Sequence, residues 1–165
     1  MKGITGETCA HLYTNRVGFT KLYPLITESK AHESLTRFIH KVGISHELHS
    51  DNAKALIQGD YRRKVKKYEI YTTETESYSP WQNNAERENK MVKKLGRYFM
   101  QSIDTPIALW PLAYTFAAEI RSRLASNKPG MQGRTPFENT YGYTPDISEY
   151  IIVLLVSMDL VLGTC

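Results

Sequence analysis

The sequence has 165 residues, the length of one ordinary domain, and its 41% hydrophobic residues suffice for a core. Its two cysteines, Cys9 and Cys165, are far apart in sequence and exclude a disulfide scaffold or a cysteine-built zinc site. The net charge is +4 and the excess is local, because residues 52–97 hold 11 Lys and Arg against 6 Asp and Glu, a surplus of 5. Composition alone fits either an anionic partner or a solvated surface.

No targeting or membrane segment is evident. Met1-Lys2 leads into no apolar stretch, as a secretory signal would require. The longest apolar run, residues 151–156, is far shorter than the roughly 20 residues that cross a bilayer. We therefore expect a soluble intracellular protein, located in the nucleus if it is functional, with no membrane partner and no small-molecule substrate.

The first quarter of the chain predicts a β-hairpin and a helix. Residues 9–15 and 19–26 are short β-prone stretches with Gly18 between them, which is typical of a hairpin. Four apolar residues then recur at i, i+3, i+4 and i+7, the spacing of an amphipathic helix that ends at Gly43. They are Leu35, Phe38, Ile39 and Val42.

Two short strands and a basic helix follow. Residues 44–49 predict a strand that ends just before Asp51. Residues 60–68 predict a helix whose apolar positions are i, i+4 and i+7 and whose other faces carry five Lys and Arg. Residues 70–73 predict the next strand. The basic cluster at 62–67 is interpreted as a solvated helix face.

Two longer helices complete the prediction. The first covers residues 84–101 and buries Ala85, Val92, Leu95 and Phe99. The second starts at residues 104–106, with Pro106 in its first turn, and ends at residues 128–130. Its buried positions are Trp110, Ala113, Tyr114, Ala117, Ile120 and Leu124. The order of elements predicts an α/β fold that starts with a hairpin and continues with crossovers.

Two acidic residues suggest chemistry on phosphates. Asp51 follows a predicted strand, and Glu86 lies in the first turn of a predicted helix, so the two carboxylates could converge on a divalent metal. The alternative is a capping Asp and an exposed helical Glu. Residues 1–50 contain no Asp, so a third carboxylate for a two-metal site is not evident.

The helix that carries Glu86 also carries a basic stripe. Positions i+4, i+7 and i+11 from Glu86 share one helical face and hold Lys90, Lys93 and Arg97. We interpret this basic stripe as a surface that positions a DNA backbone without reading bases. The alternative is a solvated face with Glu86–Lys90 as a weak ion pair.

Three amide side chains precede that helix. Gln82, Asn83 and Asn84 follow Pro80 and Trp81 in a predicted loop. Their amides could bind DNA, or they could serve only as turn residues.

Over residues 6–150, the sequence resembles the integrase catalytic core of LTR retrotransposons, most closely the copia type. The resemblance rests on three motifs: Ser50-Asp51-Asn52-Ala53, Tyr78-Ser79-Pro80-Trp81-Gln82-Asn83 with Ala85-Glu86, and Thr135-Pro136-Phe137-Glu138 followed by Gly142. The 34 residues between Asp51 and Glu86 are close to the family spacing.

The resemblance implies an RNase H-like fold, a mixed sheet flanked by helices. It also implies a DDE site that uses Mg²⁺ or Mn²⁺ to trim DNA ends and join them to target DNA. Asp51 would be the second acid and metal ligand, and Glu86 the third. Lys90 and Lys93 match DNA-contacting positions, and Gln82 falls in the catalytic loop. The partners implied are DNA and a second copy of the chain, with the helices after residue 84 as the contact.

The sequence departs from the family in three places. The family's first Asp lies on a strand before the segment that matches residues 9–15, and this sequence has no counterpart. We therefore expect an incomplete first strand, an unpaired hairpin edge and no turnover. The zinc-binding His/His/Cys/Cys region that precedes the core has no counterpart either. Residues 151–165 form an aberrant hydrophobic tail, for which we hypothesise a frameshift or a mispredicted gene end.

Four hypotheses remain open at this point. The chain is an inactive integrase-core fragment that binds DNA, or an active transferase whose missing acid is Glu7 or Glu28. Alternatively, it is a non-catalytic nucleic-acid-binding or dimerisation module, or an unrelated α/β domain with a basic helix.

Overall fold

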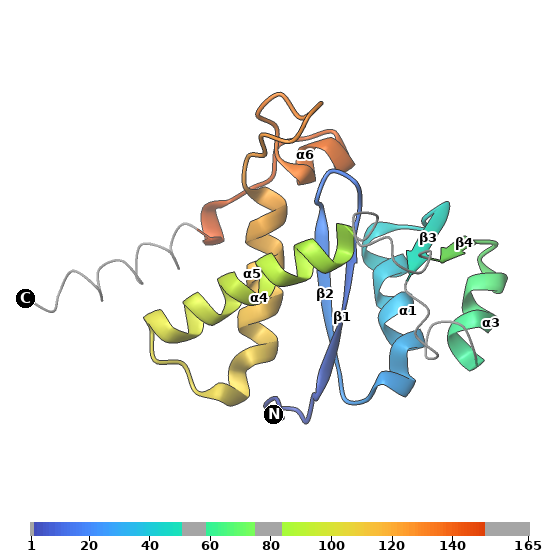
Figure 1. Ribbon diagram of the computed structural model, residues 1–165, viewed down its shortest axis with the longest axis horizontal. Helices are drawn as coiled ribbons and strands as arrows, with labels where there is room; N and C mark the ends of the chain where they lie inside the picture. The colour runs from blue at the N-terminus through green and yellow to red at the C-terminus, as the bar shows by residue number, and fades with distance from the viewer. Residues whose placement is uncertain (1, 51–58, 75–83, 151–165) are drawn as a thin grey trace, which may run out of the picture.

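The computed structural model describes residues 2–50, 59–74 and 84–150. The chain begins with an antiparallel hairpin of β1 (Cys9–Thr14) and β2 (Thr20–Leu25), as predicted (Figure 1). Its turn is closed by Asn15, whose Oδ1 accepts hydrogen bonds from the backbone N–H groups of Gly18 (3.1 Å) and Phe19 (2.9 Å). Gly18 has φ +95°, a conformation that favours glycine and allows this tight turn.

A second strand pair lies on the far side of a helix. After the short 3₁₀ helix η1 (Glu28–Lys30) comes α1 (Ala31–Val42), then β3 (Glu47–Ser50), α3 (Gly59–Lys67) and β4 (Tyr71–Glu74). Strands β3 and β4 pair in parallel, from Glu47 opposite Tyr71 to Ser50 opposite Glu74. These elements agree with the predicted ones to within three residues at each end.

The strands form two ladders. Among the described residues, β1 pairs with β2 and β3 pairs with β4, and no hydrogen-bonded ladder joins the two sheets. Both parallel and antiparallel pairing therefore occur, as in the predicted mixed sheet, but the sheet is discontinuous between β1 and β3. The edge of β1 away from β2 has no partner strand in the described ranges, in agreement with the predicted incomplete sheet.

Helix α1 connects the two ladders. Leu35 and Ile39 of α1 pack in one apolar core with Tyr61 and Val65 of α3. From the hairpin, Tyr13 packs against the same core, with its ring stacked on Phe38 at a centroid distance of 4.7 Å. The Tyr13 hydroxyl also lies 2.9 Å from Ser34 Oγ. The hairpin is thus attached to the parallel pair through side chains of α1.

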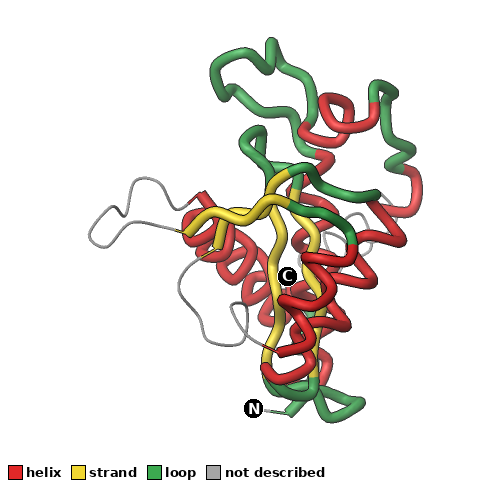
Figure 2. Tube along the Cα trace, turned by 90° about the vertical axis from the view of Figure 1, so that its right-hand side faces the viewer, coloured by secondary structure: helices red, strands yellow, loops and turns green. Residues whose placement is uncertain are grey.

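Two long helices lie on the opposite side of the hairpin from α1 (Figure 1). Helix α4 (Asn84–Ser102) is followed by η3 (Ile107–Leu109), α5 (Trp110–Arg123) and α6 (Pro136–Tyr141). A second apolar core joins Leu22 of β2 to Val92 of α4 and Ala117 and Ala118 of α5. Figures 1 and 2 both show the connection from α5 to α6 at the end of the molecule where the hairpin turns.

Two predicted features of α5 are wrong. The helix begins at Trp110 with Pro111 in its first turn, because Pro106 is extended (ψ 136°) and precedes η3 instead. The helix ends at Arg123, since Leu124 is also extended (ψ 137°). Leu124, predicted to be packed, is 50% exposed.

Within the described ranges, none of the helices has the length and apolar character that a bilayer crossing needs. Residues 151–165, for which an aberrant tail was predicted, lie outside the described residues.

Candidate nucleic-acid interface

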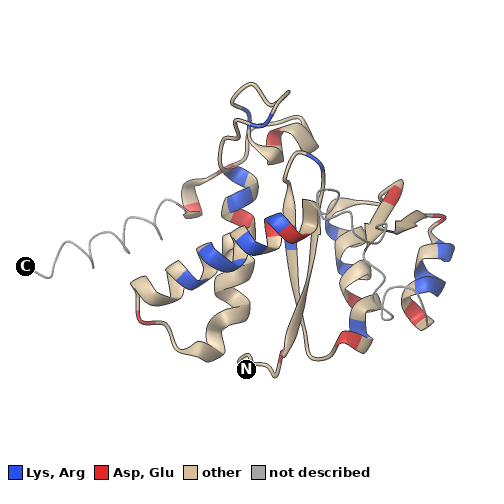
Figure 3. Cartoon of the chain, in the orientation of Figure 1, with Lys and Arg blue, Asp and Glu red and all other residues tan. Residues whose placement is uncertain are grey.

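Helix α4 presents opposite chemistry on its two faces. Its inner face buries Glu88, Val92 and Gly96. The basic stripe, Lys90, Lys93 and Arg97, is exposed on the outer face, and Figure 3 shows Lys and Arg following one another along this helix. Lys94, which was not among the predicted residues, widens the stripe, because it lies one helical turn from Lys90. Six side chains line a shallow hollow on this face: Lys90, Lys93, Lys94, Arg97, Tyr98 and Gln101.

Glu86 lies at the N-terminal end of the stripe, in the first turn of α4. Its side chain is 50% exposed, and Oε1 is 2.8 Å from Lys90 Nζ, so the ion pair that we named as the alternative interpretation is present. The hydrogen bond from Lys90, together with its charge, lowers the pKa of Glu86 below the ordinary 4.5. Glu86 is therefore ionised at neutral pH, as a metal ligand or a surface ion pair both require.

The other predicted site residues cannot be placed in the same way. Asp51, Gln82 and Asn83 lie outside the described residues, although their neighbours Ser50 and Asn84 are described. Convergence of Asp51 and Glu86 therefore stays a prediction. Among the described residues, no group of three or more His, Cys, Asp and Glu side chains has the arrangement of a metal site. Glu86, the described member of the predicted pair, offers the hard oxygen ligand that Mg²⁺ and Mn²⁺ prefer.

The hairpin keeps Glu7 and Glu28 away from Glu86. Glu7 precedes β1 and Glu28 follows β2, so both lie at the open end of the hairpin. Asn84, two residues before Glu86, lies at the turn of the hairpin. Its Nδ2 donates a hydrogen bond to the backbone oxygen of Asn15 at 2.8 Å. The six residues of β1 separate the two ends by about 20 Å at the usual rise per residue. Neither glutamate therefore lies beside Glu86.

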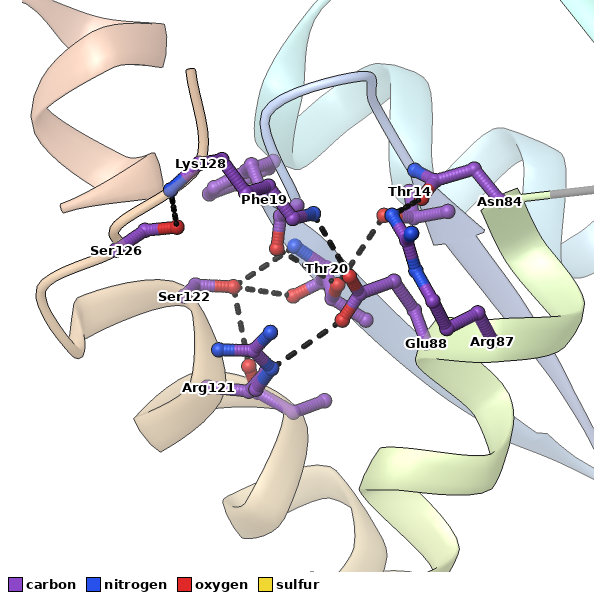
Figure 4. A network of polar contacts seen from close by, with 12 residues as sticks. Thr14, Phe19, Thr20, Asn84, Arg87, Glu88, Arg121, Ser122, Ser126 and Lys128 are labelled. Atoms are coloured by element: carbon purple, nitrogen blue, oxygen red, sulfur yellow. Dashed lines mark hydrogen bonds and ion pairs between the residues drawn. The ribbon is translucent and has the colours of Figure 1, made fainter. Parts of the chain in front are cut away.

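A buried carboxylate that sequence reasoning missed anchors the inner face of α4. Glu88 is 1% exposed. Its Oε2 is 3.2 Å from Arg121 Nε of α5, and its Oε1 is 2.9 Å from Lys128 Nζ, as Figure 4 shows. Two cations from different segments therefore compensate the charge of Glu88, as burial of a carboxylate demands.

A second polar contact joins α5 to the hairpin beside Glu88. Ser122 Oγ accepts a hydrogen bond from the backbone N–H of Thr20 and also lies 2.8 Å from the Thr20 carbonyl oxygen (Figure 4). Both Ser122 and Thr20 are fully buried. The hairpin, α4 and α5 are thus held together by directed polar bonds as well as by the apolar core.

A sequence signal for Glu88 existed. Glu88, Val92, Leu95 and Phe99 follow the i, i+4, i+7, i+11 spacing of the apolar face. A carboxylate on that face must be paired, and Arg121 and Lys128 are the partners.

Close contact between α4 and α5 fixes the outward orientation of the stripe. Gly96 lies on the inner face, where an added Cβ would overlap the ring of Tyr114. The Tyr114 ring is itself 5.7 Å from the Trp110 ring. A glycine here lets α5 approach closely, and α4 has little room to rotate about its axis.

No protein-family model and no curated protein matches the sequence. The HTLV-2 integrase catalytic core domain, solved in complex with magnesium in a trimeric form, superposes with a TM-score of 0.68 at 18% identity, covering 86% of this chain and 90% of that one.

Two further solved structures are similar. A chain of the simian T-cell lymphotropic virus intasome in complex with the PP2A regulatory subunit B56 gamma gives a TM-score of 0.67 at 20% identity, over 83% of this chain and 51% of that one. The catalytic core domain of BIV integrase gives a TM-score of 0.61 at 17% identity, covering 87% of this chain and 95% of that one. The chain therefore has the α/β, RNase H-like fold of retroviral integrase catalytic cores.

Proposed function

We propose that this chain is an integrase catalytic core of the LTR-retrotransposon type, most like copia, that binds DNA along the outer face of α4. The observation that carries the proposal is the basic stripe beside Glu86, on a helix whose inner face is fixed by Glu88 and Gly96 in an integrase-type fold. Lys and Arg side chains on one exposed face bind phosphates and release counterions.

Asp51 and Glu86 are the residues that would hold Mg²⁺ or Mn²⁺. When bound, the metal would supply charge stabilisation to a phosphate undergoing attack. The supporting facts are the position of Glu86, ionised and accessible at the start of α4, and the position of Asp51 in sequence, directly after β3. Gln82 and Asn83 would contact DNA from the segment that precedes α4.

For these 165 residues we propose DNA binding without strand transfer. Two-metal chemistry needs several carboxylates from separate elements, and this sequence supplies two at matching positions. Glu7 and Glu28 lie at the wrong end of the hairpin to add a third. A homodimer is part of the proposal, supported by exposed apolar side chains where α4 leads into α5: Ile103, Ile107 and Leu112.

The test is a charge reversal on the stripe. We expect Lys90→Glu with Lys93→Glu to weaken binding of a duplex by about tenfold or more, and to reduce the slope of log affinity against log salt by about 2. Fluorescence anisotropy over a salt series measures both. Arg62→Glu with Lys66→Glu is the matched control, since it makes the same charge change on the exposed face of α3.

Equal losses in the two double variants would mean that net charge, rather than the α4 surface, controls binding. The same preparations, incubated with labelled DNA and Mg²⁺ or Mn²⁺, should show no nicking or strand transfer. Metal-dependent cleavage that Glu86→Gln abolishes would reverse that part of the proposal. Sedimentation of the same samples reports whether the chain dimerises.

A further inference from the structure

One aromatic ring lies in the hollow on the outer face of α4. Tyr98 is the single aromatic residue among its six lining residues, and it is 62% exposed. The other five, Lys90, Lys93, Lys94, Arg97 and Gln101, are cationic or carry an amide. The hollow therefore combines cationic side chains with one exposed aromatic ring, which can contact an apolar or π surface.

Helix geometry places Tyr98 in line with the cations. Lys90, Lys94, Tyr98 and Gln101 are spaced by four, four and three residues, so they succeed one another along one side of the helix. A phosphate backbone that follows Lys90 and Lys94 would therefore bring its next base or sugar toward the Tyr98 ring. Gln101, one turn further, offers a donor and an acceptor to the edge of that base.

Aromatic side chains on the core side of α4 support the Tyr98 ring. It meets the ring of Phe99 at a centroid distance of 6.1 Å and an interplanar angle of 60°, and Phe99 packs on Phe116 of α5 at 5.3 Å. Phe99 also packs against the core that α4 shares with α5. The ring is therefore supported by the core while most of its surface stays accessible, as a stacking platform requires.

We propose that Tyr98 stacks against an unpaired base of DNA whose phosphates lie on the basic stripe, so that this surface prefers single-stranded or frayed DNA to blunt duplex. This inference rests on the proposed DNA-binding function and specifies the form of DNA bound. In a blunt duplex every internal base is already stacked between its neighbours, and its faces are closed to the ring. An unpaired base offers both faces.

The experiment compares two probes on the full chain. A fluorescent single-stranded oligothymidine and a blunt duplex of the same length are titrated against the parent and four variants. We expect Tyr98→Ala to weaken single-strand binding about tenfold and to leave duplex binding within about twofold. Tyr98→Phe, which keeps the ring, should retain the parent affinity for both. The control Tyr71→Ala removes an equally exposed tyrosine from β4 and should change neither.

The fourth variant, Lys90→Glu with Lys93→Glu, separates the two proposals. If it weakens both probes while Tyr98→Ala weakens neither, DNA binding stands and the stacking role is wrong. If it leaves duplex binding unchanged, the proposed function itself fails. Equal losses for both probes in Tyr98→Ala would also overturn the stacking role. The stacking role would also be wrong if Tyr98→Ala changed sedimentation without changing DNA binding, because Tyr98 would then be a self-association contact.

Discussion

Two glutamates of α4, two residues apart, have opposite surroundings. Glu86 is half exposed and pairs with Lys90 of its own helix, whereas Glu88 is buried and pairs with Arg121 and Lys128 from elsewhere in the chain. The first pair closes a local contact that water can replace. The second ties three segments together away from water. Identical side chains therefore have different surroundings, and the helical phase decides which one is buried and which one is exposed.

The largest effect is expected for Glu88→Ala. This change leaves two partly buried cations without their carboxylate, and breaking a buried pair costs about 3–5 kcal/mol. Urea unfolding followed by circular dichroism measures the loss. Glu88→Gln, which keeps hydrogen-bonding capacity but removes the charge, should cost less. A loss below about 1 kcal/mol for Glu88→Ala would show that the inner face does not depend on these pairs.

A smaller loss is expected for Gly96→Ala, on the same inner face. The new methyl group overlaps the Tyr114 ring, and overpacking typically costs about 1–3 kcal/mol, partly offset by the better helix propensity of alanine. The control is Lys94→Ala on the exposed face, where we expect almost no change. In combination with Tyr114→Ala, the Gly96→Ala substitution should cost less than it does alone, because the clash is gone.

The smallest effect on stability is expected for Glu86→Gln. Because the folded pKa of Glu86 is lowered, its pairing with Lys90 stabilises the protein above the ordinary pKa of 4.5 and is lost as the pH falls through the folded pKa. At this exposed position, the change in unfolding free energy should fall within measurement error. Without metal, duplex affinity should rise slightly, since a negative charge beside the phosphate path is removed. Destabilisation as large as that of Glu88→Ala would erase the distinction between the two faces.

The sequence predicted local structure well where a pattern repeats. The hairpin, α1, α3 and α4 follow from apolar spacing and from Gly18 and Gly43, and the exposed basic stripe follows from the phase of α4. The resemblance to integrase cores led to the fold that the solved structures share.

What was missed depends on contacts between distant residues or on short caps. The burial of Glu88 could have been read from its place on the apolar face of α4, but no local pattern identifies its partners, which are 33 and 40 residues away. Helix α6 has only six residues after its cap, where Thr135 and Glu138 form a capping box, and so short a helix shows little apolar periodicity. The predicted end of α5 lay beyond the observed one, because Leu124 continues the apolar spacing of the helix although its backbone is extended.

The interrupted sheet has a consequence for how the molecule comes apart. Since the described ladders share no backbone hydrogen bonds, the parallel pair is coupled to the hairpin through contacts such as Tyr13 with Phe38 and Ser34. Amide protons of β3 and β4 should then exchange with solvent in a separate cooperative unit, ahead of those in the hairpin and α5. We expect the part of the domain that contains β3 and β4 to loosen while the α4 surface keeps its shape.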